Sequence, residues 1–189
     1  MDAVDVGCRW LLGVVLVLAA AGKAWGRRPF EDFIQTLGRF GFPRAWAGPP
    51  LAATVIAAEA LSALLLLAVP LAGYAATLVL LGGFTVGLAR VWRGGEPVRC
   101  RCFGASDTPV GGAHLVRNGL LLAVAVVGVF SHRAGLGAPV SLGMGVLAGA
   151  LGALTGLFVT RWDDLVFLLR EPQPVARTSA AMKKSRPVQ

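Results

Sequence analysis

Charged residues are scarce in this chain. Of its 189 residues only 15% are Asp, Glu, Lys or Arg, whereas 56% are hydrophobic, and the mean hydropathy is +0.69. A soluble domain usually carries about 25% charged residues, so this shortage excludes an ordinary water-soluble fold. Long alternation of apolar and polar residues is missing too, which excludes a transmembrane β-barrel.

The apolar residues that dominate the sequence fall into five long runs, at 6–25, 51–69, 71–89, 113–131 and 134–160. A helix needs about 20 apolar residues to cross the hydrocarbon core, and lipid offers no partners for bare backbone groups. We therefore predict an all-α, polytopic membrane helix bundle with four to five transmembrane helices. The fourth run is the weakest, and we expect it to span only if Arg117 reaches the membrane interface.

The runs also suggest how the chain is divided. We expect a four-helix membrane domain at 1–135, an additional transmembrane helix at 136–160 and a basic, disordered tail at 161–189. Pro70 separates the second and third runs and predicts a tight hairpin. Residues 29–40 suit an amphipathic helix at the interface. The first run lacks the pattern of a cleaved signal peptide, so we expect it to be retained.

Lys and Arg residues are distributed unevenly between the two predicted faces. Most follow the first and third runs or lie in the tail, whereas the opposite face holds only Arg9 and Arg133. The positive-inside rule then places the N-terminus outside and the tail in the cytoplasm. The net charge of +8 requires no nucleic acid, because such residues contact anionic membrane lipid. We predict a multi-pass protein of the cell (plasma) membrane.

Cysteine is rare, with three in the chain, yet Cys100 and Cys102 lie two positions apart after the third run. A disulfide between them closes a very small, strained ring, and strained disulfides are readily reduced. Arg99 and Arg101 flank the pair, and positive charge favours the thiolate that acts as nucleophile. The pair therefore suits electron exchange better than stapling.

A bare pair of cysteines has other interpretations as well. It is compatible with two unrelated thiols, or with half of a metal site whose other ligands would be Cys8, His114 or His132. No second close pair of cysteines exists, so we expect no metal and no cofactor. Cys8 lies near the opposite predicted face and is expected to be inert. His114 is interpreted as a polar residue at a helix start, with proton transfer as the alternative.

Glu59 lies within the second apolar run. A carboxylate at that depth is costly unless it is paired, so it is a candidate functional residue. The structural alternative is a hydrogen bond to Lys23, Arg117 or Asn118.

Small residues recur in the fifth run, as Gly145-x-x-x-Gly149 and Gly152-x-x-x-Gly156. Such spacing forms a close-packing surface for another helix. The partner helix is either within the chain or in a homodimer.

The stretch Val98-Arg-Cys-Arg-Cys-Phe-Gly, followed by Arg117-Asn118 at the head of an apolar run, resembles the MauE branch of the DoxX-like membrane proteins. That family carries a CxCFG element between its third and fourth helices, followed by an Arg–Asn pair. Phe103 and Gly104 complete the element here, and the resemblance covers residues 5–131. Arg101 is a departure, because a small residue is expected at that position.

The resemblance implies thiol–disulfide handling. MauE proteins are linked to methylamine utilisation, where they help to mature the disulfide-rich small subunit of methylamine dehydrogenase with a thioredoxin-like partner. By the resemblance, Cys100 and Cys102 are the exchanging pair, and the chain is a possible thiol–disulfide oxidoreductase. Supporting residues by the same comparison are Glu59, Arg99, Arg101, Phe103, Gly104, Arg117 and Asn118.

The implied role and the predicted topology conflict. MauE partners fold outside the cytoplasm, whereas the charge distribution places Cys100 and Cys102 near the cytoplasmic face. Either the loop dips into the bundle, or fewer helices span, or the electron donor is cytoplasmic. Two other functions stay open: a non-enzymatic scaffold for a redox partner, and a small transporter that uses Glu59 as its coupling group.

Overall fold

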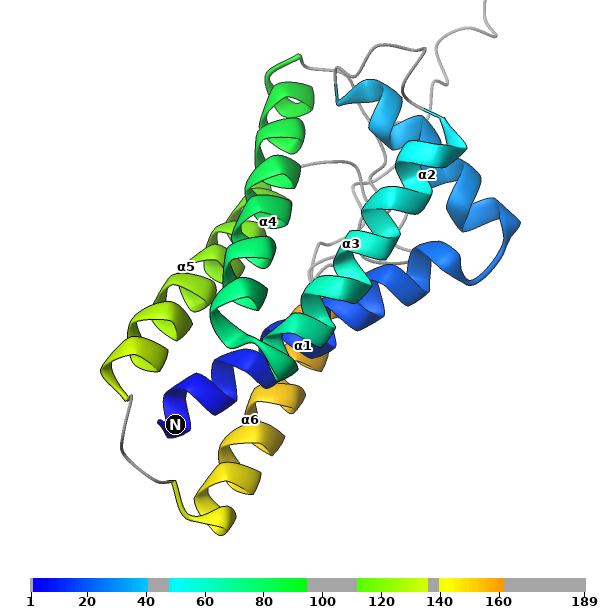
Figure 1. Cartoon of the computed structure of the whole chain (residues 1–189). Helices are drawn as coiled ribbons and strands as arrows, with labels where there is room; N and C mark the ends of the chain where they lie inside the picture. Colours follow the sequence, from blue (N-terminus) through cyan, green and yellow to red (C-terminus); the bar gives the residue numbers. More distant parts are fainter. Residues whose placement is uncertain (1, 41–47, 95–111, 136–139, 162–189) are drawn as a thin grey trace, which may run out of the picture.

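The computed structural model describes residues 2–40, 48–94, 112–135 and 140–161 (Figure 1). These residues form six helices and no strand. The helices are α1 (Ala3–Ala24), α2 (Arg27–Arg39), α3 (Pro49–Ala68), α4 (Pro70–Arg93), α5 (Gly112–Ala134) and α6 (Leu142–Thr160). Within the described part of the chain, five helices are long and apolar enough to cross a membrane, and α2 is the exception. The prediction of an all-α polytopic bundle is confirmed.

Helices α3 and α4 form the predicted tight hairpin. Only Val69 lies between them, and Pro70 occupies the first position of α4, where its missing amide hydrogen does no harm to α4 itself. The two helices touch at Gly73, because a Cβ atom there would collide with the backbone of Leu66. The hairpin is therefore closed by backbone contact.

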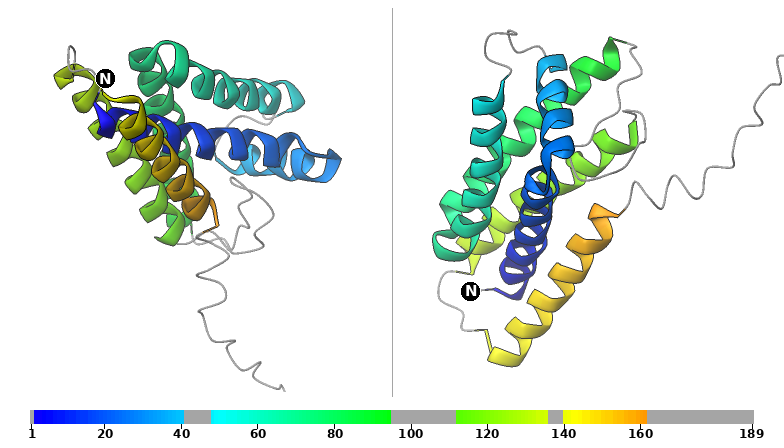
Figure 2. Two further views of the ribbon diagram at one scale, coloured as in Figure 1. Left: turned by 90° about the horizontal axis from the view of Figure 1, so that it is seen from below. Right: turned by 90° about the vertical axis from the view of Figure 1, so that its right-hand side faces the viewer.

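Helix α1 lies at the centre of the bundle, against α3, α5 and α6. Figure 2 shows α6 running beside α1 on the opposite side from the α3–α4 hairpin. Apolar side chains from α1, α3, α4 and α5 fill the interior. The buried core consists of Leu12, Val15, Leu16, Ala63, Leu66, Tyr74, Leu81, Leu121 and Ala125.

Glycines of α6 form its contact with α1. A Cβ atom at Gly152 would collide with the carbonyl oxygen of Gly7, and one at Gly156 would lie 2.8 Å from the carbonyl oxygen of Leu11. Gly149 is buried likewise, against the ring of Trp10. Of the two alternatives for this motif, the structure shows packing within the chain. A homodimer that includes Gly145, whose Cβ position meets only the side chain of Val140 at 3.9 Å, stays a prediction.

The start of α6 is capped by a side chain. The helix begins at Leu142, and the hydroxyl of Ser141 accepts a 3.4 Å hydrogen bond from the amide of Met144. A Ser at this position satisfies an amide that has no partner within the helix. The predicted tail beyond 161 lies outside the described residues, and the division of the chain into domains stays a prediction.

The amphipathic helix predicted at 29–40 is α2. Its apolar side chains Phe33 and Leu37, with Phe40 directly after it, are buried and pack on α3 and α4. The apolar face is thus used within the protein instead of being left for lipid. Helix α2 lies across one end of the bundle (Figure 1).

Candidate functional site

The first polar site is a buried ion pair between Lys23, in the last turn of α1, and Glu59, in the middle of α3. The Nζ atom of Lys23 donates to Oε1 of Glu59 over 2.6 Å and to Oε2 over 2.9 Å. The two side chains are only 1% and 3% exposed. Burial of charges is tolerated when they are paired and hydrogen-bonded. Of the three partners proposed for Glu59 from the sequence, the structure shows Lys23.

Aromatic rings of α2 and α4 cover this pair. The Nζ atom of Lys23 lies 5.1 Å from the ring centroid of Phe33 and 5.4 Å from that of Phe84, within the range of a cation–π contact. The ring of Phe40 packs edge-on against Phe84 at 6.3 Å. Phe40 also rests on Gly87 of α4, where a Cβ atom would lie 2.5 Å from the ring.

Helix α5 brings further polar side chains to the interior. His114 and Arg117 are each 4% exposed and Asn118 is 3% exposed. Arg117 acts electrostatically on Lys23. Arg117 is buried within the protein, and the expectation that it reaches the membrane interface stays a prediction. The side-chain oxygen Oδ1 of Asn118 is buried and has no hydrogen-bond partner among the described residues.

The cysteine motif itself is not described. Cys100 and Cys102 lie outside the described residues, as do Arg99, Arg101, Phe103 and Gly104. The described residues on either side of it are nevertheless informative. Leu88 and Val91 near the end of α4 and Leu115 near the start of α5 pack in the same apolar cluster as Phe33 and Phe40. Both chain ends that lead to the motif thus belong to the end of the bundle that α2 covers.

Comparison with protein families identifies the part of the chain that contains this site. The family model for methylamine utilisation protein MauE matches residues 1–131. The chain belongs to the MauE family. The matched part extends from α1 into the last turns of α5 and includes the Lys23–Glu59 pair and both cysteines. No curated protein and no solved structure matches the chain. Membership of the wider DoxX-like group stays a prediction.

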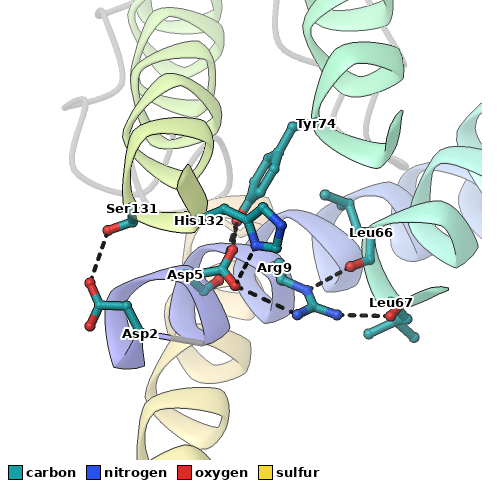
Figure 3. A network of polar contacts seen from close by, with 8 residues as sticks. All are labelled: Asp2, Asp5, Arg9, Leu66, Leu67, Tyr74, Ser131 and His132. Carbon is teal, nitrogen blue, oxygen red and sulfur yellow. Dashed lines mark hydrogen bonds and ion pairs between the residues drawn. The ribbon is translucent and has the colours of Figure 1, made fainter. Parts of the chain in front are cut away.

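This MauE-family protein has a second buried polar site, at the other end of α1 (Figure 3). Asp5 is fully buried. Its Oδ1 atom accepts a 2.9 Å hydrogen bond from the hydroxyl of Tyr74, and its Oδ2 atom lies 3.1 Å from Nδ1 of His132. Oδ2 is also 3.6 Å from the Nη1 atom of Arg9. One carboxylate therefore joins α1 to α4 and α5.

Arg9 extends this site to α3. Its Nε atom donates to the carbonyl oxygen of Leu66 over 2.6 Å, and its Nη2 atom donates to that of Leu67 over 2.8 Å. In an uninterrupted helix the carbonyl of Leu66 would accept from the amide of residue 70, but Pro70 has no amide hydrogen. Arg9, which is itself buried, supplies the missing donor.

This second site was not predicted from the sequence, where Arg9 indicated only the topology and His132 was a candidate only as a metal ligand. One signal was present: Asp5 and Arg9 are four residues apart, so they lie on one face of a helix, and ionisable residues in membrane helices face the bundle interior.

The two polar sites are separate. On α1, the buried apolar residues Leu12, Val15, Leu16 and Ala19 lie between Arg9 and Lys23. Among the described ranges, no group of three or more His, Cys, Asp or Glu side chains could hold a metal ion. Along α1, apolar side chains thus separate the polar site at one end of the bundle from the polar site at the other.

Proposed function

We propose that this MauE-family protein performs thiol–disulfide exchange in the plasma membrane, acting through Cys100 and Cys102. Its role would be to support maturation of the disulfide-rich subunit of methylamine dehydrogenase, together with a thioredoxin-like partner. The observation that carries the proposal is the Cys-Arg-Cys-Phe-Gly element inside the family match. A membrane-embedded position suits a protein that passes oxidising or reducing equivalents to exported partners.

The exchange proceeds through a mixed disulfide. The thiolate of one cysteine attacks a disulfide of the partner, forms a new S–S bond to one partner sulfur and releases the other as a thiolate. The second cysteine then attacks the mixed disulfide, so the pair becomes oxidised and the partner leaves with two reduced sulfurs. The reverse sequence oxidises the partner. Arg99 and Arg101 support the first step because positive charge favours the thiolate.

The transporter alternative is less well supported. A coupling carboxylate has to exchange its counter-ion during transport, whereas Glu59 accepts both of its close hydrogen bonds from Lys23. The apolar layer between the two polar sites also offers no polar path along α1. A scaffold that binds a redox partner without reacting is the remaining alternative, and it predicts that the cysteines can be replaced without loss.

The first experiment is alkylation of Cys100 and Cys102 in intact cells with a membrane-impermeant maleimide, before and after reductant, in a Cys8→Ser background. Labelling that appears only after reductant identifies an oxidised pair that is reachable from outside, and it contradicts the charge-based topology. Labelling only in opened cells places the pair on the cytoplasmic side and favours a cytoplasmic donor.

Exchange is tested by separate replacement of the two cysteines. The Cys100→Ser and Cys102→Ser variants should each abolish maturation of the partner, and one of them should accumulate a mixed disulfide with a thioredoxin-like protein. Cys8→Ser, which removes a half-buried thiol at the other end of α1, is the matched control and should retain activity. If both variants mature the partner as well as the control does, the chain is a scaffold.

A further inference from the structure

We propose that α2 is a lid that controls the access of water to the Lys23–Glu59 ion pair. The pair lies beneath the rings of Phe33 and Phe84, at 5.1 Å and 5.4 Å from Lys23 Nζ. Phe33, which belongs to α2, is fully buried. Movement of α2 away from the bundle would therefore uncover the ammonium group first. The proposal concerns water and protons and does not depend on thiol exchange.

The connection between α1 and α2 suits a hinge. Helix α1 ends at Ala24, Trp25 is 86% exposed, and Gly26 has a φ of +131°. That backbone conformation is open to glycine and strained for other residues. Because Trp25 is so exposed, few tertiary contacts fix the joint, and a change of direction at Gly26 moves α2 as a unit.

Apolar contacts hold α2 in its closed position, in which the ring of Phe40 rests on Gly87. A Cβ atom at Gly87 would lie 2.5 Å from the ring of Phe40, so only glycine lets the ring settle on α4. The side-chain hydrogen bonds of Arg27 and Thr36 stay within α2, to Glu31 and Asp32. An open apolar pocket of about 140 Å³ lies beside these contacts, lined by residues that include Leu37, Phe40 and Phe84.

The balance of forces makes opening accessible. Covering Lys23 and Glu59 withdraws two charges from water, which is costly even for a well-formed pair. Burial of the apolar face of α2 opposes that cost. The two terms act in opposite directions on the same movement, so the free-energy difference between the closed and open states is smaller than the larger of the two terms. In the open state the pair is hydrated and exchanges protons with water, whereas in the closed state it does not.

Among the residues that the structure describes, the groups that face the pair come from four helices. Phe33 of α2 and Phe84 of α4 lie over the ammonium, and Arg117 of α5 adds like-charge repulsion to Lys23. Glu59 of α3 supplies the one carboxylate in direct contact with the ammonium among the described residues.

A water-soluble carbodiimide reports on this access directly. The reagent activates a carboxylate, and an amine within contact distance then forms an amide bond to it. Lys23 and Glu59 are 2.6 Å apart, so they form a Lys23–Glu59 crosslink once the reagent reaches them. The crosslinked peptide is quantified by mass spectrometry over time, with the full chain in lipid nanodiscs. The Glu59→Gln variant verifies the assignment, because it should yield no such peptide.

Two glycines of α4 provide the matched variants. In Gly87→Ala the new methyl group displaces Phe40, and crosslinking should become about five-fold faster or more, as expected for a loss of about 1 kcal/mol in lid closure. Gly82→Ala, where nothing lies within 4 Å of the Cβ position, should crosslink at the rate of the unmodified chain. Equal rates in all three proteins would overturn the lid.

A second variant guards against a general loss of folding. Phe40→Ala removes the ring without adding atoms and should accelerate crosslinking as Gly87→Ala does. Hydrogen exchange should increase in α2 in both variants and stay unchanged around Asp5 and Tyr74 at the far end of the bundle. Crosslinking in the unmodified chain as fast as in detergent-denatured protein would also overturn the lid, because the pair would then always be open.

Discussion

The Nε atom of Arg9 donates a 2.6 Å hydrogen bond to the carbonyl oxygen of Leu66, which lies 57 residues away in the sequence. This bond exists because Pro70 interrupts the ladder of backbone hydrogen bonds just beyond Leu66. A buried carbonyl without a donor is costly, particularly in lipid, where water cannot replace the donor. Arg9 thereby satisfies the carbonyl that Pro70 leaves without a donor, and the same hydrogen bond attaches the α3–α4 hairpin to α1.

Replacement of Arg9 by Leu should therefore destabilise the bundle. The change leaves the carbonyls of Leu66 and Leu67 without their side-chain donor and removes the cation that balances Asp5, at an expected cost on the order of 3–5 kcal/mol. Unfolding in mixed detergent micelles, followed by circular dichroism, measures the loss. Arg133→Leu removes an exposed Arg at the same end of the bundle and is the control. Equal stability of the two variants would contradict the structural role of Arg9.

The Lys23–Glu59 pair leads to a second prediction. Lys23→Met or Glu59→Leu alone leaves one buried charge without its partner, which should lower the free energy of unfolding by about 3–5 kcal/mol. The double variant should recover most of that loss, because neither charge remains. A double-mutant cycle on purified protein gives the coupling energy between the two side chains.

The chain contains a suitable control for that cycle. Arg27 and Glu31 form an ion pair on the exposed side of α2, with side chains 92% and 56% exposed. Exposed pairs contribute little to stability, so replacing Arg27 by Met and Glu31 by Leu, singly or together, should change the free energy of unfolding only slightly. A buried pair that couples no more strongly than this exposed one would refute the proposed role of burial.

The helices could be predicted from the sequence, and one contact of the site could be narrowed to a short list. Long apolar runs determine membrane helices through composition alone, and Glu59 had three possible partners, of which Lys23 proved right. The surroundings of Arg117 could not be predicted in the same way. Whether an Arg reaches the interface depends on what neighbouring helices cover, and α5 by itself contains no information on that.

A third prediction concerns the contact between α6 and α1. Gly152→Ala places a methyl group against the carbonyl oxygen of Gly7 and should cost about 1–3 kcal/mol of stability, as overpacking does. Gly143→Ala has open space at its Cβ position and should be neutral or slightly stabilising, because Ala favours helix over Gly. The order of the two unfolding midpoints tests the contact, and a reversed order would show that α6 packs elsewhere.

The contacts of the Asp5 site between different helices could not be predicted from the sequence. Its members lie in α1, α4 and α5, and the contacts from Asp5 to Tyr74 and His132 join residues 69 and 127 positions apart. Hydropathy averaged over a run hides single polar residues within it. Only the packing of helices shows that these polar side chains meet, whereas the spacing of Asp5 and Arg9 within one helix was visible beforehand.

Tyr74 provides the most specific test of that site. Its hydroxyl donates to Asp5, and its ring lies against Gly128 of α5, where a Cβ atom would collide with the ring. Tyr74→Phe keeps the ring but removes a donor from a fully buried carboxylate, so it should lower the free energy of unfolding by about 1–3 kcal/mol. Asp5→Leu removes the carboxylate and leaves only the weaker main-chain acceptor of residue 5 at 3.2 Å, so in that background Tyr74→Phe should cost less. If Tyr74→Phe costs the same in both backgrounds, the hydroxyl acts through the main-chain carbonyl of residue 5, which lies 3.2 Å from it, and its hydrogen bond to the Asp5 carboxylate contributes nothing to stability.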